Sequence, residues 1–168
     1  MTGDVLTAAD PVRGGAVLPV AFQLNPTHTG RQMLDQWRDM GLTVGGFLTR
    51  LSCLVAETGD GYVKVICNID PGHSNFVGLV HGGVTAAMID MAGGGAVMSL
   101  LNPGETLLST DITMRYLNPV PGDCDRIAAE GRVSYSDPRK AVVDVKVTLP
   151  DGRIAAMGVV GLAIRAPR

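Results

Sequence analysis

The residue types best suited to chemistry gather around one long apolar stretch, NFVGLVHGGVTAAMIDMAGGGAVMSLL (residues 75–101). A single acid, Asp90, lies near its middle, and no Lys or Arg occurs within one helical turn on either side of it. Burying a charge without a partner costs several kcal/mol. A carboxylate at this position therefore indicates either a functional group, such as a general base, or a partly exposed helix residue with a structural partner.

A second group of candidate residues precedes the acid. His81-Gly82-Gly83 stands where a helix is expected to begin, and Asn75 lies six residues before His81. Glycines allow a ligand to approach the backbone closely, and the free N–H groups of a helix start favour negative charge. Each of these residues alone fits an ordinary turn or loop. Together, at fixed spacing before an acid, they form a more specific pattern.

The spacing of Gly82 and Asp90 limits how the two could act together. Eight residues of helix extend about 12 Å along the axis, at roughly 1.5 Å per residue, so one reacting carbonyl cannot contact both groups of the same helix. A two-fold dimer with antiparallel helices would combine Gly82 of one chain with Asp90 of the other in two equivalent sites. The Gly93-Gly94-Gly95 run would allow close backbone approach there, or else kink the helix against a sheet.

The remaining pattern predicts the elements that must position these residues. A short helix is expected from His28 to Gly41, because Met33, Leu34, Trp37 and Met40 follow three- and four-residue spacing. Strands are expected at 47–57, 62–69, 106–117, 125–135, 140–149 and 154–165. Short turns between consecutive strands predict antiparallel pairing. The result is an α+β layout in which a sheet covers one side of the long helix, and the N-terminal helix or a second subunit covers the other.

Length and composition narrow the class of protein. The 168 residues predict one domain (26–168) after a loose N-terminal arm (1–25). A net charge of −2 gives no footprint for nucleic acid or acidic membranes. The N-terminus lacks a basic start followed by an apolar stretch, and the most apolar segment (84–101) contains Asp90 and three glycines. A soluble, cytoplasmic protein is expected.

Cysteine and histidine usage argues against structural metals and disulfides. Cys53, Cys67 and Cys124 are odd in number, far apart in sequence and without a CxxC pair, which is typical of a reduced compartment. None of the three histidines stands at ligand spacing with another ligand, so no metal is expected.

The pattern of Asn75, His81-Gly82-Gly83 and Asp90, followed by STDITMRYLNPVPGD (109–123), resembles the hotdog-fold acyl-CoA thioesterases, especially the phenylacetate-pathway (PaaI-like) type. The resemblance covers roughly residues 45–165. It implies an antiparallel sheet of about six strands wrapped around one central helix, and hydrolysis of an acyl- or aryl-CoA to acid and CoA. It also implies a homodimer with shared sites and no cofactor beyond the substrate's own coenzyme A. The family often forms tetramers that are dimers of dimers, and the choice between dimer and tetramer stays open.

The resemblance also implies roles for the residues at the helix. Asp90 matches the family's general base or nucleophile, and Gly82 matches the backbone N–H that polarises the thioester carbonyl. His81 matches the neighbouring loop histidine, and Gly83 is expected to contact the substrate. Thioester hydrolysis places negative charge on the carbonyl oxygen, and loss of one donor to such an oxygen typically slows a reaction about 100- to 1000-fold.

Two further positions complete the candidate site. Asn75 matches a side chain that positions the carboxyl group or the attacking water, and Ser109 matches a strand position that holds the water. The family's Phe-x-Arg-Pro strand ending is here Tyr116-Leu117-Asn118-Pro119. The contact made by that arginine is therefore not expected here.

Two alternatives stand beside hydrolysis. A hydratase or dehydratase on the same fold would use His73 as base and Asp90 as acid, but the Pro-Gly pairs and Glu expected of that class are absent. A non-catalytic acyl-CoA-binding protein would have lost the acid or the polar positions, all of which are present. The acyl group stays open, because its candidate contacts also fit a hydrophobic core: Trp37, Met40, Phe47, Phe76 and Met88.

Overall fold

The computed structural model describes residues 25–167, so the predicted N-terminal arm lies almost wholly outside the described residues. The helices are α1 (Gly30–Met40), α2 (Gly46–Arg50) and α3 (Gly82–Met98), with 3-10 turns η2 (Gly41–Thr43) and η3 (Pro71–His73). The strands are β1 (Cys53–Gly59), β2 (Tyr62–Asn68), β3 (Thr106–Tyr116), β4 (Arg126–Ser136), β5 (Lys140–Thr148) and β6 (Ile154–Arg165).

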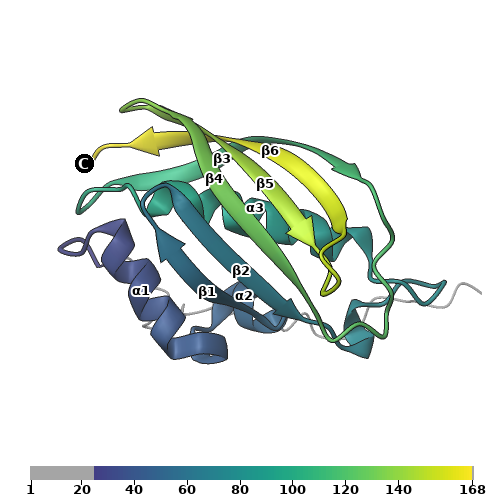
Figure 1. Cartoon of the computed structure of the whole chain (residues 1–168). Coiled ribbons are helices and arrows are strands. Elements are labelled where there is room, and N and C mark those ends of the chain that lie inside the picture. The colour runs from purple at the N-terminus through teal and green to yellow at the C-terminus, as the bar shows by residue number, and fades with distance from the viewer. Residues whose placement is uncertain (1–24, 168) are drawn as a thin grey trace, which may run out of the picture.

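The six strands form one antiparallel sheet in the order β1-β2-β4-β5-β6-β3. The sheet curls around α3, and α1 lies along the β1–β2 end (Figure 1). The predicted α+β layout of about six strands around one long helix is confirmed, as is the short N-terminal helix, which ends at Gly41 as expected.

One predicted pairing is wrong. Consecutive strands were expected to pair, but β3 pairs with β6 at the edge of the sheet, and β4 lies next to β2. The connection from β3 to β4 is held by the loop before α3 and does not form a hairpin. The Val80 N–H donates to the Val120 carbonyl at 2.9 Å, and the Gly122 N–H donates to the Gly78 carbonyl at 3.1 Å.

The first predicted strand, 47–57, is wrong in its N-terminal half. Residues 46–50 form the short helix α2, and the strand begins at Cys53. Gly45 and Gly46 have φ of 93° and 63°, a region that favours glycine, and they turn the chain into α2. The Thr49 hydroxyl then accepts from the Gly45 N–H and donates to the Leu42 carbonyl, both at 2.8 Å, which fixes the turn.

Two of the three consecutive glycines of α3 bring the helix close to the sheet. A Cβ added at Gly93 would lie 2.7 Å from Cγ2 of Val160, and one at Gly95 would lie 2.9 Å from Cγ1 of Val63. Gly94 differs, because the nearest atom to its added Cβ would be Cδ1 of Leu107 at 3.8 Å, an ordinary contact. Close packing on the sheet therefore explains Gly93 and Gly95 but not Gly94.

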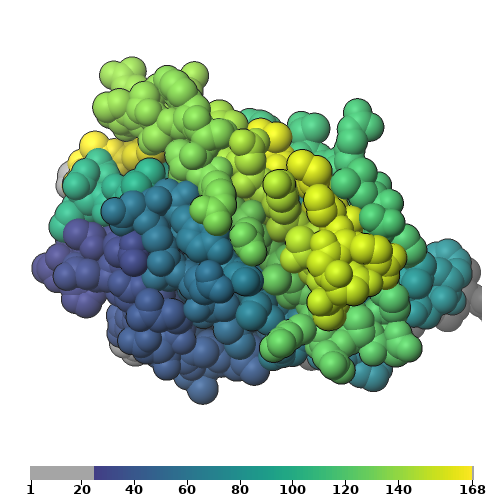
Figure 2. Space-filling view, in the orientation of Figure 1, coloured from purple at the N-terminus to yellow at the C-terminus, as the bar shows by residue number. Residues whose placement is uncertain are grey.

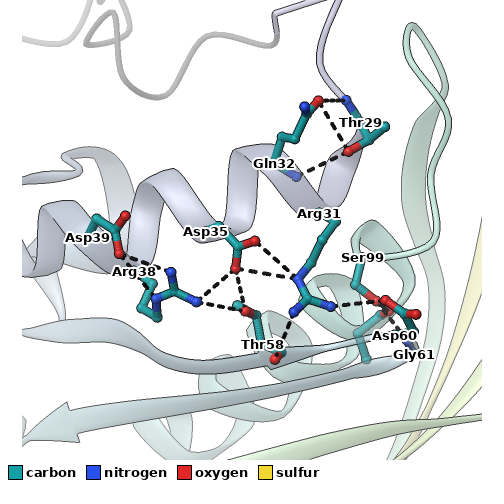
Figure 3. A network of polar contacts seen from close by, with 11 residues as sticks. Thr29, Arg31, Gln32, Asp35, Arg38, Asp39, Thr58, Asp60, Gly61 and Ser99 are labelled. Carbon is teal, nitrogen blue, oxygen red and sulfur yellow. Dashed lines mark hydrogen bonds and ion pairs between the residues drawn. The ribbon is translucent and has the colours of Figure 1, made fainter.

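Helix α1 is fastened to the β1–β2 hairpin by a network of ion pairs and hydrogen bonds (Figure 3). Asp35 accepts from Arg31 (Nε–Oδ2 3.2 Å), from Arg38 (Nη1–Oδ1 2.8 Å) and from the Thr58 hydroxyl, and Arg31 also pairs with Asp60 at 2.9 Å. The Thr58 hydrogen bond and the positive charge of Arg31 hold the pKa of Asp35 below its ordinary value. In the space-filling view the purple and blue atoms of α1 and α2 cover one end of the molecule (Figure 2).

The described region also gives findings on free cysteines, metal ligands and membrane-spanning helices. Cys53 and Cys67, far apart in sequence, lie opposite each other in the β1–β2 ladder, and both are buried as free thiols. Between residues 25 and 167 no group of three His, Cys, Asp or Glu side chains is placed to hold a metal ion. Within the same range no helix has the length and apolarity that crossing a bilayer requires.

Candidate active site

Asp90 and Ser109 meet on the side of α3 that faces away from the centre of the sheet. The Ser109 hydroxyl on β3 donates to Oδ1 of Asp90 at 2.6 Å. Asp90 is half-buried, and Ser109 is exposed. A hydroxyl donor at this distance makes a charge-assisted bond that orients the carboxylate. No group among residues 25–167 bonds to the second carboxylate oxygen.

A β-bulge aims Ser109 at the helix. The β3–β6 register shifts between Ser109 and Asp111, so Thr110 is the extra residue of the bulged strand. Bulges bend a strand locally and are frequent beside active sites, where they redirect a side chain. Asp90 and Ser109 are 19 positions apart in sequence, and the geometry of the bulged strand brings their side chains into contact.

His81, Gly82 and Gly83 form the N-terminal end of α3, as predicted. His81 is the N-cap, and its Nδ1 accepts from the Gly83 N–H at 2.9 Å. The Gly83 N–H is thereby occupied. The Gly82 N–H precedes the helical hydrogen-bond ladder, and no acceptor among residues 25–167 takes it. Gly82 therefore presents the backbone donor at the helix start.

Asn75 holds the loop before the helix. Its Oδ1 accepts from the N–H groups of Val77 at 3.0 Å and Leu79 at 3.1 Å. Asn75, His81, Gly82 and Gly83 together line a cleft of about 510 Å³ at the start of α3. The structure thus brings these four predicted residues together.

The six predicted residues fall into two clusters within one chain. The cleft contains the four residues at the start of α3, and the Asp90–Ser109 pair lies on the same helix eight residues after Gly82. That interval corresponds to about 12 Å along the axis. Neither Asp90 nor Ser109 lines the cleft. A single chain therefore holds two separate clusters of candidate residues.

The sequence prediction missed Tyr116 as a residue of the cleft. Its hydroxyl donates to the Gly82 carbonyl at 2.9 Å, and its ring stands against the glycine, since a Cβ at Gly82 would come within 2.8 Å of the hydroxyl oxygen. The sequence signal that could have identified Tyr116 is its position at the start of the Tyr-Leu-Asn-Pro strand ending. Asn118, which stands where the family has arginine, donates from Nδ2 to the Ile154 carbonyl at 2.8 Å and so has a structural contact.

His73, the base of the hydratase alternative, is used in the fold. Its side chain is buried, its Nδ1 accepts from the Asp70 N–H at 3.0 Å, and its Nε2 lies 3.2 Å from the Leu51 carbonyl. The first contact requires the proton to be on Nε2, which then donates to Leu51. Both ring nitrogens are thus engaged away from Asp90.

The five residues predicted as candidates for an acyl pocket lie in different environments. Trp37 and Phe47 line an apolar cavity of about 290 Å³ between α1, α2, the β1–β2 hairpin, α3 and β3, and Met91, the residue after Asp90, also lines it. Met88 is fully buried core, Met40 packs against the core from outside, and Phe76 is 100% exposed on the loop before α3.

Comparison with known proteins identifies the family of the chain. Residues 77–156, which include His81 to Ser109, match the model of the thioesterase superfamily. A candidate esterase of Halobacterium salinarum is 33% identical over 114 residues, which cover 62% of this chain and 71% of that protein.

Solved structures share the fold at low sequence identity. A thioesterase from Haemophilus influenzae superimposes with a TM-score of 0.71 at 18% identity, covering 79% of this chain and 90% of its own. A hypothetical thioesterase from Streptococcus pneumoniae, crystallised with coenzyme A, gives a TM-score of 0.62 at 23% identity, covering 69% and 88%. The sheet wrapped around one helix is the hotdog fold, and the chain belongs to the thioesterase superfamily.

Proposed function

We propose that the protein is an acyl-CoA thioesterase that hydrolyses an acyl- or aryl-CoA to the free acid and CoA. The observation that carries the proposal is the Asp90 carboxylate, oriented by Ser109 at 2.6 Å on the open side of α3. Within the superfamily we assign the chain to the phenylacetate-pathway type, on the order of Asn75, His81-Gly82-Gly83 and Asp90. Coenzyme A is the proposed thiol because the Streptococcus pneumoniae relative was crystallised with it.

In this proposal the cleft at the start of α3 and the Asp90–Ser109 pair are the two half-sites of one active site, and each has a distinct task. The Gly82 N–H polarises the thioester carbonyl and stabilises the negative charge that develops on its oxygen. Asp90 acts on the carbonyl carbon, either by taking a proton from the attacking water or by direct attack. Ser109 holds the carboxylate or the water, and Asn75, which lines the Gly82 cleft, positions the carboxyl group or the water from the copy that supplies Gly82. No metal is needed for these steps.

The separation of the half-sites supports a dimer as the working unit. Gly82 of one copy and Asp90 of a second can meet at one thioester if two α3 helices pack antiparallel. Among the described strands β3 has β6 as its one neighbour, and it carries exposed Leu108, Ile112 and Tyr116. A long, apolar edge strand is a template for pairing with another chain. We assign this edge and the open side of α3 to the contact between two copies, and a tetramer would pair two such dimers.

The direct test is thiol release from a panel of acyl-CoAs by wild type and the Asp90→Asn variant. The substitution keeps the size of the side chain and its hydrogen bond with Ser109 but removes the base. Wild type should turn over at least one acyl-CoA, and the variant should lose about 100- to 10,000-fold in kcat. Equal activity of the two proteins, or inactivity of a folded wild type on every thioester, would overturn the proposal.

The same assay addresses the hydratase alternative. Crotonyl-CoA hydration gives loss of absorbance of the conjugated thioester without thiol release. We expect release without hydration, because both nitrogens of His73 are engaged in the fold.

A further inference from the structure

We propose that the 290 Å³ cavity beside Asp90 receives the acyl group and selects neutral, apolar groups of medium size, with Gly94 setting the depth available. This inference rests on the proposed thioesterase function and deepens it. The cavity is lined by residues of α1, α2, β1, β2, α3 and β3, and every lining residue within the described part of the chain is apolar or glycine.

Two elements connect the cavity to the carboxylate. On α3, Met91 and Gly94 line the cavity, and Gly94 lies one turn after Asp90, on the same face of the helix. On β3, Leu107 lines the cavity and precedes Ser109 by two residues, which places both on one face of the strand. The register is regular between them, since the bulge begins after Ser109. An acyl chain whose carbonyl lies at Asp90 therefore finds this cavity directly beside it.

Gly94 is not explained by packing within the chain. The glycines on either side are needed, because an added Cβ would lie 2.7 Å from Val160 or 2.9 Å from Val63. At Gly94 the corresponding distance to Leu107 is 3.8 Å, so alanine would fit. Glycine inside a helix is less favourable than alanine. The missing side chain leaves space in the cavity next to the reacting carbonyl.

The walls opposite α3 are held in place. Leu34 and Trp37 come from α1, which the Asp35 network fastens to the β1–β2 hairpin (Figure 3). The Gly30 N–H donates to the Leu101 carbonyl at 3.0 Å, which ties the start of α1 to the segment after α3. A cavity with fixed walls discriminates by size, because the ligand cannot displace them without breaking these contacts.

Volume and polarity define the class of acyl group. An apolar protein cavity of about 150 Å³ binds benzene, so this one has room for an aryl ring with its linking carbon or for a linear chain of similar bulk. Among residues 25–167 no charged side chain lines the cavity, so this lining would leave a second carboxylate on the acyl group buried without a partner. Phenylacetyl and octanoyl groups meet the requirement, whereas succinyl and palmitoyl groups do not.

The test compares wild type with Gly94→Leu and Phe47→Ala on acetyl-, octanoyl-, phenylacetyl-, succinyl- and palmitoyl-CoA. Wild type should prefer octanoyl- or phenylacetyl-CoA. Gly94→Leu should lower kcat/KM on these two by about 100-fold more than on acetyl-CoA, since an obstructed pocket discriminates by chain bulk. Phe47 is 57% exposed, so its truncation should open the cavity towards palmitoyl-CoA without unfolding the protein.

Trp37 gives a readout that does not require turnover, because it is the single tryptophan of the 168 residues and lines the cavity. Octanoate and phenylacetate should change its fluorescence in wild type but not in Gly94→Leu, and the two acids separate the linear from the aryl preference. Equal losses on acetyl- and octanoyl-CoA in Gly94→Leu, or a wild type that prefers succinyl- or palmitoyl-CoA, would overturn the pocket and leave the thioesterase intact. A fluorescence response in a folded protein that hydrolyses no thioester would overturn the proposed function instead.

Discussion

The two sides of helix α3 differ in what their residues are for. The side against the sheet is closed, with Met88, Ile89, Ala92 and Val97 each fully buried. The other side is half-buried along Ala86, Asp90 and Gly94, and it carries a carboxylate and a cavity in place of packed side chains.

This difference separates folding from function within one helix. Burial of apolar side chains against the sheet stabilises the fold, at about 25 cal/mol per Å² of apolar surface. In a single chain the open side buries little apolar surface. It carries the polar Asp90–Ser109 pair where apolar side chains could pack. Groups that perform a task are expected where the local rules of stability are broken.

Removing the Gly82 N–H should cause the largest loss of activity among the changes below. Gly82→Pro deletes this donor at the first helical position, where proline is tolerated. We expect kcat to fall about 100- to 1000-fold while the thermal midpoint changes little. Gly82→Ala is the matched control, because it adds the same Cβ against the Tyr116 ring and keeps the N–H. An alanine variant as inactive as the proline variant would assign the loss to crowding by the Cβ.

Adjacent glycines on the two sides should respond in opposite directions to the same change. Gly93→Ala places a Cβ 2.7 Å from Val160, and the overpacking should lower the free energy of unfolding by about 1–3 kcal/mol. Gly94→Ala has room and gains helix propensity, so it should raise that free energy by up to about 1 kcal/mol. Urea titration of the two variants measures both, and effects of equal sign would refute the division into a packed and an open side.

The hydrogen bond from Ser109 to Asp90 should contribute to kcat on the open side of α3. Ser109→Ala should lower kcat about tenfold and leave KM nearly unchanged, because a hydrogen bond to a charged group contributes about 1.5–3 kcal/mol before solvent exposure weakens it. Ser109→Thr keeps the hydroxyl and should restore most of the rate. If threonine fails to rescue a folded enzyme, the serine acts through packing and not through its hydroxyl.

The Asp35 network makes a smaller, pH-dependent contribution to stability. The pKa of Asp35 is lowered in the folded state, by the Thr58 hydrogen bond first and then by Arg31, so its stabilisation is present above its unfolded pKa of about 3.9. It is lost as the pH falls through the folded pKa. Because the side chain is partly exposed, we expect Asp35→Asn to remove less than about 1 kcal/mol at pH 6.

Urea titrations between pH 3 and pH 6 measure this effect. Wild type should lose more stability over the range than Asp35→Asn, and Asp39→Asn controls for removal of a charge from the same helix. Parallel pH profiles for wild type and Asp35→Asn would contradict the assigned role.

Much of the fold was predictable because the patterns are local. Helix α3, its first residue and five of the six strands follow from apolar periodicity and turn residues. Helix α2 was missed because five residues are too few to establish a helical period, and Phe47-Leu48 fits a strand equally well. The place of β3 beside β6 depends on contacts between distant residues, which strand periodicity does not contain.

Six members of the candidate site were proposed from the sequence, whereas Tyr116 and the bulge that brings Ser109 to Asp90 were not. The order of Asn75, His81, Gly82 and Asp90 stands in the sequence, whereas the Ser109 bond to Asp90 depends on a bulge. The three consecutive glycines look alike in sequence. Only the positions of Val63, Val160 and Leu107 distinguish Gly94 from its neighbours.

The central claim is that the open side of α3 is half of a site completed by a second copy, and a heterodimer tests it most directly. Chains carrying Asp90→Asn and Gly82→Pro, each with its own affinity tag, are co-expressed and the mixed dimer is purified. Each homodimer should be inactive, and the mixed dimer should recover about half of the wild-type thiol release, because one of its two sites is intact. A folded mixed dimer as inactive as the two homodimers would show that Gly82 and Asp90 do not act on one thioester across two chains.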